Sequence, residues 1–315
     1  LQSEEQAIEN VLIAVDAGEC IVWVRNTVDD AVSAFQQLRE RHPDPARCLL
    51  FHARFAMVDR QRIESEVIRR FGKTSNASLR WGQVLVTTQV FQESLDCDAD
   101  QMVSDVAPID LLIQRAGRLQ RHQRGKRPDP VLQVLAPKWD EAPKADWLSQ
   151  AHRGTQAVYK DTSLIWLTQR ILCELGAITM PGEKHNGARR LIESVYAFPV
   201  DDIPEALDQA RFERTGMDKF ATSMATHNAL SLEDGYHLDG DFDPWQEERE
   251  FGTRLSDEPS VEVVLLKLRG DELVLWVEDH RHADRLSRCR LRESQVKKLA
   301  ALPEHHTEQW EALQQ

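Results

Sequence analysis

The sequence predicts an α/β protein built on a mostly parallel β-sheet. Over residues 1–137, short apolar runs alternate with amphipathic segments of helical spacing. Nearly every residue of these runs is hydrophobic, as is typical of strands that are covered on both faces. In such a fold the strands end at one edge of the sheet, where ligands bind. We therefore looked for chemistry at the ends of the predicted strands.

The predicted elements of this first part follow in chain order. Strands are expected at Cys20–Arg25, Arg47–Phe51, Val84–Thr87, Met102–Val106 and Val131–Leu135. Helices are expected over Ser3–Asp16, from Asn26-Thr27 to about Arg41, over Met57–Phe71, and after Pro108 through Gln114–Arg121. The helices show apolar residues at three- and four-residue spacing and end at glycine or at polar turns. Lys73–Trp81 and Thr88–Asp96 are expected to be a polar loop and a polar turn.

Beyond Pro137 the pattern changes. We expect a loop over Lys138–Ala157, helices over Val158–Leu175, Ala188–Ala197, Pro204–Glu213, Glu293–Leu302 and Pro303–Leu313, and a hairpin over Val261–Glu278. Residues 218–258 are acidic and turn-rich, which favours a long loop or a partly disordered linker. The predicted organisation is an α/β domain at 1–137, a helical linker at 138–217 and an α+β accessory domain at 218–315.

Composition limits the function classes. A net charge of −13 argues against a chain coated for nonspecific nucleic-acid binding, although one basic patch interrupts it. The patch comprises Arg115, Arg118, Arg121, Arg124, Lys126 and Arg127. No apolar run approaches the ~20 residues that a membrane helix needs. The five cysteines form no CxxC pair, as expected of reduced thiols in a cytosolic protein without a zinc site. Because the chain begins at Leu1, we expect it to be processed or part of a longer protein.

The strongest chemical signal is Gln114–Arg121, which reads QRAGRLQR. Arg118 and Arg121 are three residues apart and would share a helix face. Gly117 between them would let a ligand approach the backbone. Two guanidinium groups beside a strand end suit a phosphoryl group, whereas the alternative is a solvated basic helix. The apolar residues just before the motif favour the functional interpretation.

These motifs also resemble a known family. Gln114–Arg121 resembles motif VI of superfamily 2 helicases, Thr88–Asp96 resembles motif V, and His52–Phe55 resembles motif IV. The order and spacing of the three agree with that family. The wording of TTQVFQESLD and of SDVAPIDLLIQRAGRLQRH is most similar to the helicase–nuclease of type I CRISPR systems, and HARFAMVDRQRIE favours type I-E. The resemblance implies a RecA-like fold for the first part of the chain.

The resemblance also implies roles for individual residues. Arg118 and Arg121 match the arginines that reach the γ-phosphate, and Arg121 is the expected arginine finger. Asp96 matches the carboxylate that binds the ribose. The remaining implied residues are Ser94, Gln114 and Gly117 at the ATP site, and Asn26, Thr27, His52, Arg54 and Thr88 along single-stranded DNA. Contacts of this kind would be made to phosphates and would tolerate any base sequence.

Several parts of a complete helicase–nuclease are not found. Gly72-Lys73-Thr74 resembles the end of a phosphate-binding loop, but Val67 stands where the loop needs glycine. No acidic Walker B pair and no His-Asp dipeptide occurs in the sequence. The first motor lobe and the nuclease domain are therefore not represented. We expect ATP and Mg²⁺ to be held mainly by the first lobe, the nuclease metal to lie outside this chain, and the chain alone to be inactive.

The implied function is the C-terminal half of an ATP-dependent DNA translocase in CRISPR antiviral defence. Its expected partners are single-stranded DNA, the first RecA-like lobe, the nuclease domain and the Cascade complex, with no membrane. Two alternatives stay open at this point. One is a lobe of another superfamily 2 helicase, and the other is a noncatalytic subunit or a fragment bound by an inhibitor protein.

Overall fold

The computed structural model describes residues 3–178, 187–199, 202–207 and 260–297, together with His306 and Gln309. Predicted features at 218–258, the helix over Pro303–Leu313 and most of the helix over Pro204–Glu213 lie outside the described residues. Within this part of the chain, no helix is both long and apolar enough to cross a membrane.

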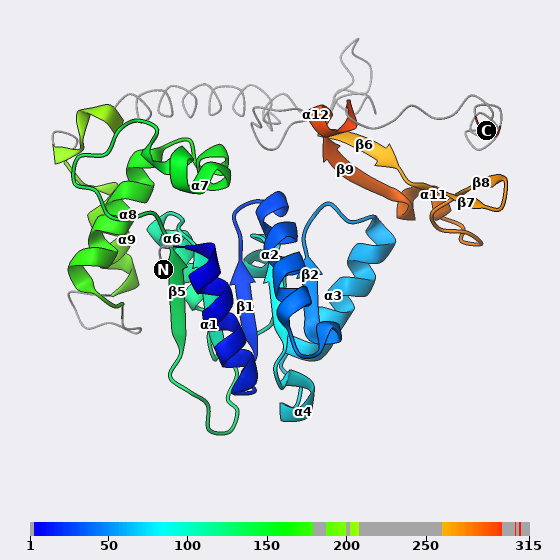
Figure 1. Cartoon of the computed structure of the whole chain (residues 1–315), viewed down its shortest axis with the longest axis horizontal. Coiled ribbons are helices and arrows are strands. Elements are labelled where there is room, and N and C mark those ends of the chain that lie inside the picture. Colours follow the sequence, from blue (N-terminus) through cyan, green and yellow to red (C-terminus); the bar gives the residue numbers. More distant parts are fainter. Residues whose placement is uncertain are drawn as a thin grey trace, which may run out of the picture.

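A five-stranded parallel sheet forms the centre of the molecule (Figure 1). Its strands are β1 (Ile21–Val24), β2 (Cys48–Phe51), β3 (Val84–Thr87), β4 (Gln101–Asp105) and β5 (Val131–Leu135). They lie in the order β2-β3-β1-β4-β5, so β1 is central. The predicted α/β class, the parallel direction and all five strands are confirmed. Register pairs Val24 with Thr87 and with Ser104, which aligns the ends of β1, β3 and β4.

Helices cover both faces of the sheet. On one face, α1 (Glu4–Asp16) and α2 (Val28–Arg41) pack against alternate residues of β1 and β3, including Trp23. On the other face, α3 (Met57–Phe71) and α5 (Val90–Ser94) pack against the intervening residues. This division explains why the strands are continuous apolar runs, because each face has its own core.

Local sequence sets the ends of these helices. The hydroxyl of Ser3 accepts from the Gln6 N–H, and that of Thr27 accepts from the Asp30 N–H, so both are N-caps. The helix α3 ends at Gly72, where a side chain would collide with the Ile68 carbonyl oxygen. The tripeptide that resembles a phosphate loop therefore follows a helix, as the sequence predicted.

Three predictions in this region were wrong. The supposed polar loop contains α4 (Ala77–Arg80), and the supposed polar turn contains α5. The helix α6 (Ile109–Ala116) ends before Gly117, so Arg118 and Arg121 do not share a helix. The chain turns instead at Gln120, whose φ is 45° and whose N–H donates to the Ala99 carbonyl. A bridge between Ala99 and Leu119 holds this turn against the sheet.

The helical segment after the sheet contains α7 (Trp147–Val158), α8 (Thr162–Leu175) and α9 (Ala188–Tyr196). The expected loop over Lys138–Ala157 is thus wrong over α7, which is kinked at His152 with φ −138° and ψ 63°. Ile109 of α6 joins the apolar core of this segment with Trp166 and Leu191. The segment is therefore packed onto the sheet domain.

The C-terminal part pairs differently from the expected single hairpin. The strands β7 (Leu266–Arg269) and β8 (Glu272–Leu275) form the hairpin predicted around Gly270, but β6 (Ser260–Val264) pairs with β9 (Arg288–Arg292). The short helices α11 (Ala283–Leu286) and α12 (Glu293–Val296) flank β9. This part meets α3 through a hydrogen bond of 2.7 Å from Trp276 Nε1 to Asp59 Oδ2. In Figure 1 it lies, like α7, towards the end to which the sheet strands point.

Candidate nucleotide and DNA site

The residues predicted to bind ATP lie around the turn that follows α6. Arg118 donates to the Gln92 carbonyl at 2.6 Å and to the Leu95 carbonyl. Arg121 forms an ion pair with Asp96, with 3.0 Å between Nε and Oδ1. The guanidinium groups therefore have different partners, which corrects the expectation that they point the same way. Burial and the nearby Arg121 charge lower the pKa of Arg118.

The other predicted ATP residues border the same turn. Gln114 and Gly117 are exposed, one in the last turn of α6 and one just after it. Gly117 has the ordinary helical φ of −63°, so its backbone does not require glycine. Ser94 is the last residue of α5, two positions before Asp96. The fold thus brings the predicted ATP residues into one region, around the end of α5 and the turn after α6.

The residues predicted to bind DNA lie after β1, β2 and β3. Thr27 caps α2, and its hydroxyl also donates to Asp30 Oδ2 at 2.6 Å. His52 is buried and stacks on Phe55, with 4.1 Å between ring centroids. Burial, aided by the nearby Arg54 charge, lowers the pKa of His52 to about 4. The ring is therefore neutral near pH 7.

The next members of this set are also partly engaged within the chain. Arg54 pairs with Asp29 at 2.8 Å, and Thr88 is buried. Asn26 is buried and uses its whole amide: Nδ2 donates to the Val106 carbonyl at 2.8 Å and to Thr155 Oγ1 at 2.9 Å. Its side chain has no donor left for a phosphate.

Arg115 lies between the two predicted sets of residues, and sequence reasoning did not single it out. It was expected in an exposed basic patch, but its side chain is fully buried. The signal was present, because Arg115 follows Leu112 by three residues on the apolar face of α6. Desolvation lowers its pKa.

Two further arginines of the predicted patch, Arg124 and Arg127, form ion pairs with a buried aspartate. Asp98 is fully buried and contacts Arg80 at 2.9 Å, Arg124 at 3.2 Å and Arg127 at 2.8 Å. Asp100 lies beside them and accepts from the Cys20 N–H at 2.9 Å. The patch is therefore much less available to anions than the sequence suggested.

Comparison with known proteins places this geometry in a family. The family described as "CRISPR-associated nuclease/helicase Cas3, C-terminal" matches residues 17–124, which include every predicted site residue. The Escherichia coli K12 CRISPR-associated endonuclease/helicase Cas3 is 32% identical over 222 residues, covering 69% of this chain and 22% of the relative. The crystal structure of T. fusca Cas3 is 26% identical and superposes with a TM-score of 0.70 over 98% of this chain.

In sequence and in fold, the chain matches the C-terminal part of Cas3 proteins. It corresponds to a C-terminal part of a CRISPR-associated helicase–nuclease, and the alternatives left open by the sequence are not favoured. The chain spans about a fifth of the E. coli Cas3 and 36% of the T. fusca Cas3. A T. fusca Cas3 structure with ADP superposes with a TM-score of 0.69 at 26% identity, covering 97% of this chain and 36% of that one. A chain of a CRISPR RNA-guided surveillance complex has the same fold, with a TM-score of 0.64 at 24% identity, over 98% of this chain and 38% of that one.

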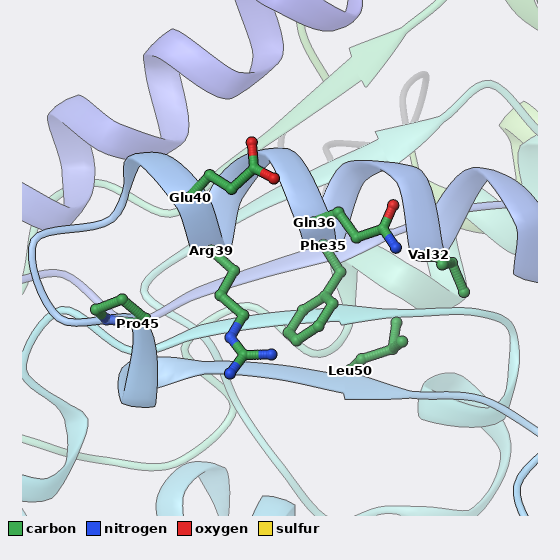
Figure 2. Close-up of a pocket in the computed structure, with 7 residues that line it drawn as sticks. All are labelled: Val32, Phe35, Gln36, Arg39, Glu40, Pro45 and Leu50. Carbon is green, nitrogen blue, oxygen red and sulfur yellow. The ribbon is translucent and has the colours of Figure 1, made fainter.

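Two surface hollows of the Cas3-like chain lie apart from the predicted site. A groove of about 610 Å³ runs between α2 and the edge strand β2, where Phe35 and Arg39 extend toward Leu50 (Figure 2). A second hollow of about 410 Å³ lies in the helical segment, where Trp139 stacks on Trp166 with centroids 5.2 Å apart. Neither hollow is lined by a predicted ATP or DNA residue.

The described part of the chain contains no group of three or more His, Cys, Asp or Glu side chains arranged to hold a metal ion. Its acidic side chains near the predicted ATP site are already paired, as Asp96 is with Arg121 and Asp98 with three arginines. The predicted ATP residues therefore present cationic and hydrogen-bonding groups, and no carboxylate cluster for a metal lies among the described residues.

Proposed function

We propose that this chain supplies one wall of an ATP site and part of a single-stranded DNA track in a Cas3-type helicase–nuclease. The observation that carries the proposal is the pairing of Arg121 with Asp96 beside Arg118. The side chains of Arg121 and Asp96 are 47% and 61% exposed, so their exchange for nucleotide partners would cost little. Arg121 would stabilise charge on the γ-phosphoryl group, and Asp96 would accept from the ribose.

ATP with Mg²⁺ would be held mainly by the first RecA-like lobe, which the matched Cas3 proteins are long enough to contain. Mg²⁺ would neutralise the phosphate charge that develops during transfer. On this chain Arg118, Gln114, Gly117 and Ser94 would complete the second wall. The T. fusca Cas3 structure with ADP supports nucleotide binding by this chain's relatives.

Single-stranded DNA would follow the carboxyl edge of the sheet past Thr27, His52, Arg54 and Thr88, with Asn26 beneath them. Hydrolysis would move the strand in the 3′-to-5′ direction. A neutral His52 can donate one hydrogen bond to a phosphate, and Arg54 adds charge. Recruitment by Cascade, joint action with the nuclease domain and a cytoplasmic location belong to the same proposal. The Cascade partner is proposed because one chain of a CRISPR RNA-guided surveillance complex has the same fold as this chain.

The test is ATP hydrolysis with single-stranded DNA, measured for this chain and for the full-length protein. We expect turnover only from the full-length protein. Arg121→Ala in that protein should lower kcat roughly 10³-fold, the lower end of an arginine finger's effect. Arg189→Ala is a matched control, since Arg189 is 91% exposed and pairs with Glu193 on its own helix α9. Turnover by the chain alone, or full activity of Arg121→Ala, would refute the proposal.

A further inference from the structure

Arg115 satisfies its whole guanidinium group inside the protein. Nε donates to Gln92 Oε1 at 3.0 Å. Nη1 donates to Ser104 Oγ at 2.6 Å and to the Asp105 carbonyl at 3.1 Å. Nη2 donates to Asn26 Oδ1 at 3.1 Å and to the Tyr159 hydroxyl at 3.4 Å. All five N–H groups are used, and none of the five acceptors is a carboxylate.

These acceptors come from both sides of the predicted site. Gln92 belongs to α5, and its own carbonyl accepts from Arg118 on the ATP side. Asn26 stands just before α2 on the DNA side and touches Thr155 of α7. Arg115 is therefore connected to Arg118, a predicted ATP residue, through Gln92. It is bonded directly to Asn26, a predicted DNA residue.

The helix α7 is seated tightly on this network. A Cβ atom at Gly154 would lie 2.1 Å from Asp30 Oδ2 and 2.9 Å from Thr27 Cγ2, so a larger residue would force these side chains to shift. Thr155 is buried, and Tyr159 ends the helix. A displacement of α7 would break bonds to both Asn26 and Arg115. The helical segment therefore contacts the predicted DNA set directly through Asn26 and reaches the predicted ATP set through Arg115 and Gln92.

An apolar residue could fill the same volume at lower energetic cost. Burying a guanidinium that makes no direct ion pair carries a desolvation penalty of several kcal/mol, and hydrophobic replacements of buried ions are often neutral or stabilising. Packing alone therefore gives no reason for an arginine here. The need to orient five polar groups from several elements does give a reason for an arginine.

We propose that Arg115 is a positioning residue that couples the ATP wall to the DNA track through Gln92, Asn26 and α7. The inference rests on the proposed function and deepens it. In this role Arg115 touches neither nucleotide nor DNA. It keeps Gln92, and hence Arg118, in register with Asn26, so that DNA bound on one side is sensed on the other.

The test is DNA stimulation of ATP hydrolysis by the full-length protein carrying Arg115→Lys or Thr155→Val. We expect stimulation by single-stranded DNA to fall about 10-fold, within the range of typical coupling between sites. The DNA-independent rate and the KM for ATP should change less than twofold. Thr168→Val is the matched control, because Thr168 is also buried and its hydroxyl has no partner among the described residues.

Thr155→Val is nearly isosteric, so it separates coupling from folding, which thermal unfolding checks directly. Unchanged stimulation in folded Thr155→Val and Arg115→Lys would overturn the coupling role. A parallel fall in DNA-independent turnover would do the same, because it indicates a general structural role. Failure of the proposed function looks different, because the unmodified full-length protein would then show no DNA-stimulated hydrolysis.

Discussion

Asp96 and Asp98 are two residues apart in sequence, and both face arginines, yet they lie in opposite environments. The Asp96 side chain is 61% exposed and has one arginine partner, whereas Asp98 is fully buried and has three. Two bridges make the difference, joining Cys97 to Gly72 and Ala99 to Leu119. They enclose Asp98 and leave Asp96 at the rim. An exposed pair can exchange partners, whereas a buried cluster fixes the backbone.

The largest test of this contrast is Asp98→Asn in the 315-residue chain. Loss of the charge would leave three arginines around a neutral amide, and breaking a buried ion network costs roughly 3–5 kcal/mol. We expect the free energy of unfolding, measured by urea denaturation, to fall by that amount. A loss below 1 kcal/mol would mean that the cluster is not stabilising and would remove the contrast with Asp96.

His52 gives a second test, through pH. Its folded pKa of about 4 lies below the unfolded value of 6.5, so the unfolded state takes up a proton first as pH falls. Its contribution, at most about 3 kcal/mol, is present above pH 6.5 and is lost by about pH 4.

The pKa of Asp98 is lowered by the hydrogen bond from Arg127 and by the Arg80 charge, which outweigh its burial. Its contribution is therefore lost only as pH falls below 3.8.

The measurement for His52 is the unfolding free energy of the chain and of His52→Gln at several pH values. The gap between the two proteins should change between pH 6.5 and 4, in favour of the variant at the acid end. A constant gap over this range would show that His52 is not held neutral by the fold.

The smallest expected effect is that of Asp96→Asn on stability. Exposed ion pairs contribute about 0–1 kcal/mol, so the unfolding free energy should change by less than about 0.5 kcal/mol. The same denaturation series used for Asp98→Asn measures it. A loss approaching that of Asp98→Asn would show that the rim pair is structural and not available to a nucleotide.

The sequence predicted the sheet well because buried parallel strands leave an unmistakable apolar pattern. It failed where tertiary contacts decide. Tryptophan and proline residues punctuate Lys138–Ala157, so its sequence predicts a loop, yet α7 forms there and Gly154 packs against Asp30. The end of α6 was extended because QRAGRLQR has no helix breaker except Gly117.

The candidate site was predicted in outline and not in detail. The resemblance to helicase motifs V and VI implied that Arg118, Arg121 and Asp96 lie together, and the structure pairs Arg121 with Asp96. Arg115 donates to Asn26, 89 positions away, and the Asn26 side-chain donors bond Val106 and Thr155, 80 and 129 positions away. No local pattern encodes such contacts. Charge alone suggested a basic patch, because sequence does not reveal which arginines have buried acidic partners.

The contact of Asn26 with Thr155 has a consequence for how the protein can be divided. A cut after Pro137, where composition changes, would keep all five strands and both faces of the sheet core. It would also remove Thr155 and Tyr159, leaving the Asn26 amide and the Arg115 guanidinium each one partner short. A fragment in which Asn26 and Arg115 keep all their hydrogen-bond partners must therefore extend past α7. The end of the sheet is not a suitable place to divide the chain.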